Sequence, residues 1–383
     1  MLKLLPSCKG QFAIFWFLAI ALILAPEALA ANSAADISSL KQKAQSGDAQ
    51  AQTTLGLAYR EGDGAPADDG KAAEWFCKAA DQGNPVAQNA LGVLYRIGRG
   101  VPKDLDQAFQ LYKKSAAQKY APGVFNTGIS YYNGDGVPVD MVMAYAWMLY
   151  ADELGEKAAH DAVVRTAAEL EGRATDGELK LARLLDTGVE LPRDETGAAR
   201  WYRIAAEHGN AEAQVRYGLM LKDGRGTAQN PGEALQWLER AAQQKSGLAM
   251  FTLGYAYQKG ILGQQVDVKK AIQWYEGAAT QGHPGAMVNL GLMQMDGTAG
   301  PPNFQKAYFW FYMADAFKIP QAKAGIATAS SHLSSKEIAK TQDAVGAWWQ
   351  KHGTTVLLVR RPEAEPTNTD LVPENGKQQP TSK

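Results

Sequence analysis

The chain has 383 residues, of which 46% are hydrophobic and 21% are charged. This composition excludes an intrinsically disordered protein, because it supplies enough apolar surface for a core. The 39 Lys and Arg residues nearly balance the 40 Asp and Glu residues, so the chain lacks the basic excess that binding to phosphate backbones requires. We therefore expect no nucleic-acid partner.

The first 30 residues have the pattern of a secretory signal peptide. Lys3 and Lys9 precede an apolar run over residues 12–25, and the small residues of Ala28 to Ala30 follow it, which predicts a cut after Ala30. The apolar run is shorter than the roughly 20 residues of a membrane span, although an uncleaved anchor remains the alternative. The sequence thus predicts a periplasmic or secreted protein with no stable membrane span after cleavage.

A repeat with a period of 36 residues fills the next part of the chain. Its first segment is a helix such as Ala51 to Arg60, in which Ala51, Leu55 and Tyr59 share one face. A glycine beside the leucine costs about 1 kcal/mol in helix propensity. Because this glycine nevertheless recurs from copy to copy, we expect a neighbouring helix to pass too closely for a side chain. Seven copies of this position occur, at Leu55-Gly56, Leu91-Gly92, Thr127-Gly128, Leu181-Ala182, Tyr217-Gly218, Leu253-Gly254 and Leu290-Gly291.

A turn and a second helix complete each copy. Glycines and a proline end the first helix, since glycine adopts left-handed backbone angles and proline cannot continue a helix. An aspartate then has the position of an N-cap, as at Asp68, Asp104, Asp140 and Asp194. The second helix carries a tryptophan that we expect to be buried, at Trp75, Trp147, Trp201, Trp237, Trp274 and Trp310.

The consensus Ala-x-x-x-Leu-Gly-x-x-Tyr-x-x-Gly-x-Gly-Val-Pro-x-Asp-x-x-Lys-Ala-x-x-Trp-Tyr-x-Lys-Ala-Ala resembles the Sel-one-like repeat (SLR) family, a relative of the tetratricopeptide repeats, over residues 37–318. The resemblance implies an all-α fold, a right-handed α-solenoid of about seven helix-turn-helix repeats with a concave, ligand-facing surface. It also implies an adaptor that binds a protein partner, and no single biochemical activity.

The repeats are interrupted once. Gly128 and Ala182 lie 54 residues apart instead of 36, which predicts an added helix between the third and fourth copies, and further helices follow the last copy. We expect helical caps at both ends of the solenoid and a flexible joint at Gly172 to Gly177. The predicted division is a signal peptide (1–30), an N-terminal repeat block (31–155), an inserted helix and joint (156–176), a C-terminal repeat block with capping helices (177–352) and a disordered tail (353–383).

An enzyme is the alternative function class. Ser38 and Lys41 have the Ser-x-x-Lys spacing in which a lysine can activate a serine nucleophile, and some SLR proteins, rich in cysteine, have been linked to β-lactam binding. Neither a Lys-Thr-Gly nor a Ser-Asp-Asn motif accompanies the pair, and we interpret it as the opening turn of a helix from Ile37 to Gln45. We expect no enzyme, and keep a β-lactam- or glycan-acting hydrolase as the alternative.

No cofactor is expected either. The five histidines fall at unrelated positions of the repeat, which argues against a metal site. The Gly-x-Gly turns lack the Gly-Lys-Ser/Thr that would hold a nucleotide.

Two rows of polar residues on the first helices are candidates for binding a protein, with envelope polysaccharide as a second ligand class. They vary between copies while their neighbours do not, which suits a binding surface and equally a solvated face. Met295 joins them because methionine adapts to irregular apolar partners, although methionine at helical spacing also fills cores. The candidates in the first row are Asn126, Lys180, Arg216, Thr252 and Asn289, those in the second row are Tyr132, Lys222 and Gln258, and Met295 is added to them.

Cys77 is the remaining candidate. Its equivalents in four other copies are Lys113, Arg203, Glu239 and Glu276, which predicts an exposed thiol. In an oxidising compartment such a thiol can form a disulfide between two chains. An idle or glutathione-capped thiol is the alternative.

Overall fold

The computed structural model describes residues 34–359, and side chains over residues 37–352. This part consists of 18 helices, α2 to α19, with no strand, which confirms the all-α solenoid. The predicted signal peptide and the tail beyond Val359 lie outside the described residues. No described helix combines the length and apolar character that a membrane crossing requires.

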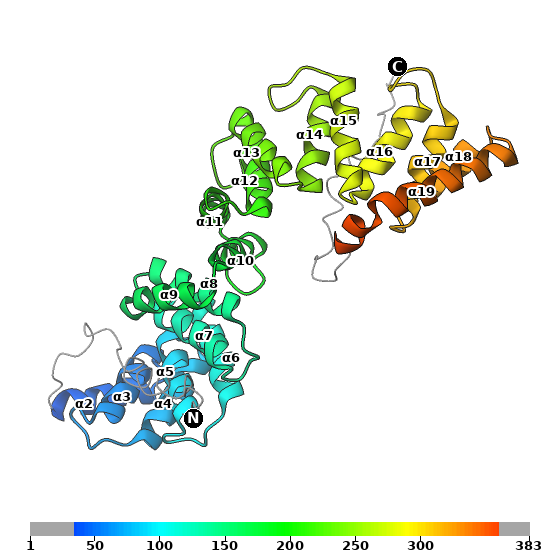
Figure 1. Cartoon of the computed structure of the whole chain (residues 1–383). Helices are drawn as coiled ribbons and strands as arrows, with labels where there is room; N and C mark the ends of the chain where they lie inside the picture. The colour runs from blue at the N-terminus through cyan, green and yellow to red at the C-terminus, as the bar shows by residue number, and fades with distance from the viewer. Residues whose placement is uncertain (1–33, 360–383) are drawn as a thin grey trace, which may run out of the picture. The chain divides into compact units, whose positions relative to one another are not determined.

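The helices form two compact units that divide between His208 and Gly209 (Figure 1). Unit 1 contains α2 (Ala34–Gln45), α3 (Ala49–Glu61), α4 (Asp69–Asp81), α5 (Pro85–Ile97), α6 (Leu105–Ala116), α7 (Ala121–Asn133), α8 (Met141–Glu153), α9 (Lys157–Glu169), α10 (Ala174–Thr187) and α11 (Glu195–Glu207). Unit 2 contains α12 (Ala211–Asp223), α13 (Pro231–Gln243), α14 (Gly247–Lys259), α15 (Val268–Thr280), α16 (Pro284–Met295), α17 (Phe304–Asp315), α18 (Pro320–Ser330) and α19 (Ser335–Val359).

Seven helix pairs form the repeats, each built from a first and a second helix that pack on one another, from α3 with α4 to α16 with α17. Six of the seven first helices end at a glycine in the left-handed conformation, such as Gly62 with φ 76°, whereas α16 ends at Asp296 with φ −88°. The predicted N-caps of the second helices are confirmed. The carboxylates of Asp68, Asp104, Asp140 and Asp194 each accept a hydrogen bond from the backbone N–H three residues later.

The recurring glycine lies against the second helix of its own repeat. A Cβ at Gly56 would stand 2.6 Å from the ring of Phe76, and one at Gly254 would stand 2.6 Å from the ring of Tyr275. Both distances are shorter than the nonbonded contacts that Cβ atoms make in proteins. A side chain therefore does not fit at these positions, and the predicted close approach is confirmed.

The expected burial of the tryptophans is confirmed for only two of them, and another residue fills the contact with the glycine. Trp147 and Trp237 are buried, but the other four tryptophans are only half-buried. The residue after the tryptophan position faces the first helix, because one step along a helix turns a side chain by about 100°. These fully buried residues are Phe76, Tyr112, Met148, Tyr202, Leu238, Tyr275 and Phe311.

Buried amides join neighbouring repeats in unit 1. Gln88 Nε2 donates to the backbone oxygen of Ala80 in the preceding repeat, at 3.3 Å. Its Oε1 accepts from Gln118 Nε2 at 2.9 Å. The fourth repeat replaces this amide pair by Glu178 and His208, whose Nδ1 lies 2.9 Å from the carboxylate. These bonds satisfy polar groups that would otherwise be buried without partners.

Two second helices are covered on several sides. Helix α8 packs against α7, α9 and α10, and α17 packs against α16, α18 and α19. Residues 143–151 of α8 are all buried, which explains its apolar sequence. The predicted inserted helix, α9, therefore covers one side of α8.

The boundary between the two compact units is not a boundary of the predicted repeat blocks, and the predicted division of the chain stays a prediction. Because α10 packs on α8, the fourth repeat belongs to unit 1, and the division falls after His208. The joint at Gly172 to Gly177 stays a prediction. The end helices also extend further than expected, since α2 begins at Ala34 and α19 continues past His352 to Val359.

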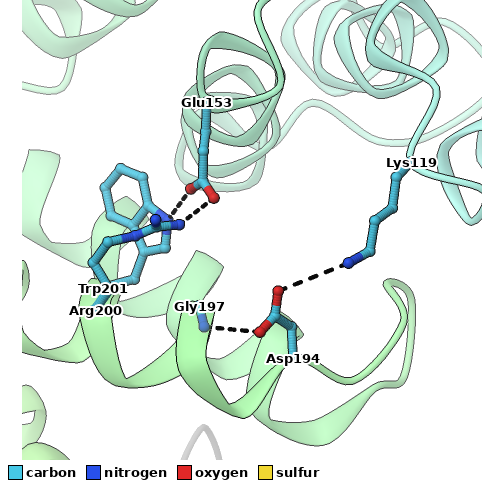
Figure 2. Close-up of polar contacts among 6 residues, drawn as sticks. All are labelled: Lys119, Glu153, Asp194, Gly197, Arg200 and Trp201. Atoms are coloured by element: carbon cyan, nitrogen blue, oxygen red, sulfur yellow. Dashed lines mark hydrogen bonds and ion pairs between the residues drawn. The ribbon is translucent and has the colours of Figure 1, made fainter. Parts of the chain in front are cut away.

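Polar contacts hold α11 against the preceding repeats of unit 1 (Figure 2). Glu153, at the end of α8, accepts hydrogen bonds from Arg200 and from Trp201 Nε1, the latter at 2.6 Å. Lys119 Nζ, in the segment after α6, lies 3.7 Å from Asp194 Oδ2. The N-terminal half of α11 is thus tied to two earlier repeats.

Glu153→Gln tests this attachment. Loss of the charge weakens the bonds to Arg200 and Trp201, and we expect the free energy of unfolding in urea to fall by about 0.5 to 1 kcal/mol. This decrease in the free energy of unfolding should be smaller at high salt. The matched control is Glu207→Gln, which breaks only an exposed pair with Arg203 inside α11. Equal losses for the two variants would contradict the attachment.

Candidate binding surface

Two residues of the first predicted row lie inside the solenoid. Asn126 is only 6% exposed, and its Nδ2 donates to Asn89 Oδ1 at 2.8 Å. Thr252 is buried, and its Oγ1 donates to the backbone oxygen of Leu248 at 2.8 Å. This placement corrects the expectation that they line a groove, because their polar groups bind neighbours within the fold. Lys180 is half-buried on α10.

The second row is also largely engaged within the chain. The hydroxyl of Tyr132 donates to the carboxylate of Glu169 on α9, with oxygen distances of 3.0 and 2.9 Å. Burial of the ring, and to a smaller extent the Glu169 carboxylate, raises the pKa of Tyr132 to about 12. Lys222 Nζ lies 2.7 Å from Asp223 Oδ1. Tyr132 therefore links α7 to α9, while Lys222 stays half-buried at the end of α12.

Gln258 and Asn289 meet at one buried hydroxyl. Tyr275 donates to Gln258 Oε1 at 2.8 Å, and the side chain of Asn289 also bonds to it. Burial of the ring raises the pKa of Tyr275 above its ordinary value. These two candidates support the packing of α15 between α14 and α16.

A row of apolar residues on α12, α14 and α16 remains open. Leu219, Tyr255 and Leu292 have the same register in three successive repeats, one helical turn from the first predicted row. Leu219 and Tyr255 are half-buried, and Leu292 is 37% exposed. We call Arg216, Leu219, Tyr255, Leu292 and the half-buried Met295 the open face of unit 2.

The exposure of this row was not predicted from the sequence. Its equivalents in unit 1 are Leu57, Val93, Ile129 and Arg183, of which Leu57 and Ile129 are buried. An apolar residue at this register therefore has the pattern of a core residue. One signal was available in the sequence. The fourth repeat has Arg183 at this position, and each of the three repeats after it has an apolar residue there.

Charged groups lie within the open face and at its borders. Arg216 Nε lies 3.6 Å from Glu212 Oε1. Lys259, at the end of α14, is exposed and makes no ion pair with a described residue. Asp296 follows α16 and is also exposed. An apolar strip with polar edges is the usual make-up of a protein-binding patch.

The remaining candidates, Ser38, Lys41 and Cys77, belong to unit 1 and not to the open face. Ser38 is exposed inside α2 and not at its start, and Lys41 Nζ lies 5.7 Å from the centre of the Tyr59 ring. Cys77 is exposed as predicted, and burial together with Asp81 raises the pKa of its thiol. Disulfide formation between chains stays a prediction. Among the described residues, no group of three or more His, Cys, Asp and Glu side chains is arranged to hold a metal ion.

His283 begins α16 as an N-cap. Its Nδ1 accepts from the backbone N–H of Ala286 at 3.3 Å, and its ring stacks on Phe251 with centres 4.3 Å apart. Burial lowers the pKa of His283 to about 4. The folded protein thus binds fewer protons than the unfolded chain between about pH 6.5 and 4. This histidine makes the free energy of unfolding fall as the pH decreases through that range.

His283→Asn should remove this part of the pH dependence. Asparagine retains the cap, as Asn84 and Asn210 show at the corresponding position of two other repeats, and it does not titrate. Unfolding in urea at pH 7 and at pH 5 measures the effect. The wild type should lose more stability than the variant between these pH values, and identical losses would refute the role of His283.

Tyr275→Phe tests the buried hydrogen bonds. It leaves Gln258 without its donor, and we expect the free energy of unfolding to fall by about 1 to 2 kcal/mol. The seventh repeat has Phe311 and Met295 at the same two positions. The double variant Tyr275→Phe, Gln258→Met should therefore be more stable than the sum of the single losses predicts. Strict additivity in urea unfolding would contradict a coupled pair.

Comparison with known families and structures identifies the repeat. The model described as "Sel1 repeat" matches residues 49–84, 85–120, 121–155, 175–210, 211–246, 247–283 and 284–314. The structure of c5321, a protective antigen of uropathogenic Escherichia coli with an SLR fold, is 27% identical, with 88% of this chain and 76% of that chain covered and a TM-score of 0.45.

A Sel1 repeat protein from Oxalobacter formigenes is 30% identical, with 69% of this chain and 96% of that chain covered and a TM-score of 0.37. Comparison with the curated proteins finds no match. Sel1 repeat proteins generally act as protein-interaction scaffolds. Seven matches spread over more than half of the sequence show that the chain belongs to the Sel1 repeat family.

Proposed function

We propose that this chain is a protein-interaction scaffold of the bacterial periplasm or cell envelope, and that the open face of unit 2 binds its partner. The observation that carries the proposal is the exposure of Leu292 in line with Leu219 and Tyr255. Three apolar side chains at one register of three successive repeats form a patch that gains by being covered.

Side-chain chemistry supports this choice over the predicted polar rows. Tyrosine provides a large contact area with little loss of conformational entropy, and Met295 can adapt to an irregular partner surface. In unit 1 the residues that correspond to Arg216 and Met295 are engaged within the chain, as the bonds from Asn126 to Asn89 and from Tyr132 to Glu169 illustrate. Leu219, Leu292 and Met295 of the open face are apolar, so no polar bond of theirs has to break before a partner binds.

The location rests on the N-terminal sequence. The basic residues, apolar run and Ala28 to Ala30 direct the chain to export, with a cut after Ala30. An exported scaffold would meet proteins and polysaccharide of the envelope. We favour a protein partner because apolar side chains dominate the open face.

Capture from an envelope fraction tests the proposal. The full chain, Leu292→Glu and Val139→Glu are immobilised in equal amounts after circular dichroism has confirmed their helix content. Val139 is 60% exposed in unit 1, so Val139→Glu adds the same charge to a different surface. A partner should be retained by the wild type and the control and lost from Leu292→Glu. Identical captured proteins, or polysaccharide alone, would contradict the proposal.

A further inference from the structure

The sequence that follows α19 contains one short apolar segment. Among residues 360–383, Leu371 and Val372 are the only large aliphatic side chains, and no aromatic residue is present. Asp370 and Glu374 stand on either side of the segment Leu371-Val372-Pro373. We propose that this segment binds to the open face of unit 2 when no partner is present, an inference that rests on the proposed function of that face.

The chain between α19 and this segment is long enough. Leu371 lies 12 residues after Val359, which allows a span of up to about 40 Å. Helix α19 packs on α17 and α15, the second helices of the last two repeats. Packed helices lie about 8 to 10 Å apart, and a helix of 13 residues is about 20 Å long. The segment can therefore reach α14 and α16 from the end of α19.

The chemistry of the segment matches that of the face. Leu371 and Val372 would cover Tyr255 and Leu292, the two adjacent members of the apolar row. The acidic flanks of the segment complement Lys259, which is exposed beside Tyr255 on α14 and has no ion pair among the described residues. Asp296, the exposed acid at another border of the face, repels the acidic flanks, so the segment would lie with Asp370 or Glu374 toward Lys259 and away from Asp296.

Attachment to the same chain strengthens such a contact. A tethered segment has an effective concentration in the millimolar range, so even a weak interaction would occupy the face for much of the time. A partner must then displace the segment, which makes the tail a competitor that sets the threshold for partner binding.

A peptide of residues 364–378 with a fluorescent label tests the inference by fluorescence anisotropy. It is titrated with the full wild-type chain and with a full chain carrying Leu371→Ser and Val372→Ser. We expect the peptide to bind the variant chain, and to bind the wild-type chain at least fivefold more weakly because the intact tail competes. In the variant chain, Leu292→Glu should weaken peptide binding at least tenfold.

Two further variants separate surface charge from misfolding. Lys259→Glu changes an exposed side chain and should also weaken binding, whereas Val139→Glu in unit 1 should leave it unchanged. No peptide binding, or binding that Leu292→Glu and Lys259→Glu leave intact, would overturn the inference. If Leu292→Glu still abolishes partner capture in that case, the proposed function stands and only the tail contact is refuted.

Discussion

The contact between the recurring glycine and a buried side chain of the second helix is the constraint on which six of the seven repeats depend, and the fourth repeat has the small residue Ala182 in its place. It brings two helices so close that a Cβ at Gly92 would stand 2.7 Å from the ring of Tyr112. The ring fills the space that a side chain on the first helix would occupy. The rotation of the pair is then fixed, and with it the faces that each helix presents to the next repeat and to solvent.

Two further helices pack on the second helix of both the third and the seventh repeat. The solenoid continues after the third repeat and ends after the seventh. Helices α9 and α10 pack on α8, as α18 and α19 pack on α17. Helix α10 is largely buried, with seven buried residues from Gly177 to Leu185, and pairs with α11 to start a new repeat. In α19, Thr341 and Val345 are the only buried residues among those whose side chains are described. A polar outer face lets a solenoid end.

Much of the fold could be predicted from the sequence, because glycine, proline and capping residues act on their own neighbourhood. The repeat boundaries, the caps such as Asp104 and the tight contact at Gly92 all follow from local chemistry. The buried residue was misassigned by one position, from Trp75 to Phe76, since periodicity alone does not resolve a rotation of about 100° between two aromatic residues.

The binding surface was harder to predict, because the use of a polar side chain depends on partners that are distant in the sequence. Asn126 is engaged by Asn89, and Gln258 by Tyr275, and neither pairing has a local signal. The unit boundary after His208 depends in the same way on the packing of α10 against α8. Leu292 had the pattern of a core residue, and only the packed structure shows its exposure.

The central claim is that partners bind unit 2 through the row formed by Leu219, Tyr255 and Leu292. Site-specific photo-cross-linking in living cells tests it most directly, with the reactive group placed at position 255 or 292 and, for comparison, at the equivalent positions 93 and 183 of unit 1. The account predicts adducts with a partner protein from positions 255 and 292 only. Adducts from positions 93 and 183 alone, or from no position, would contradict it.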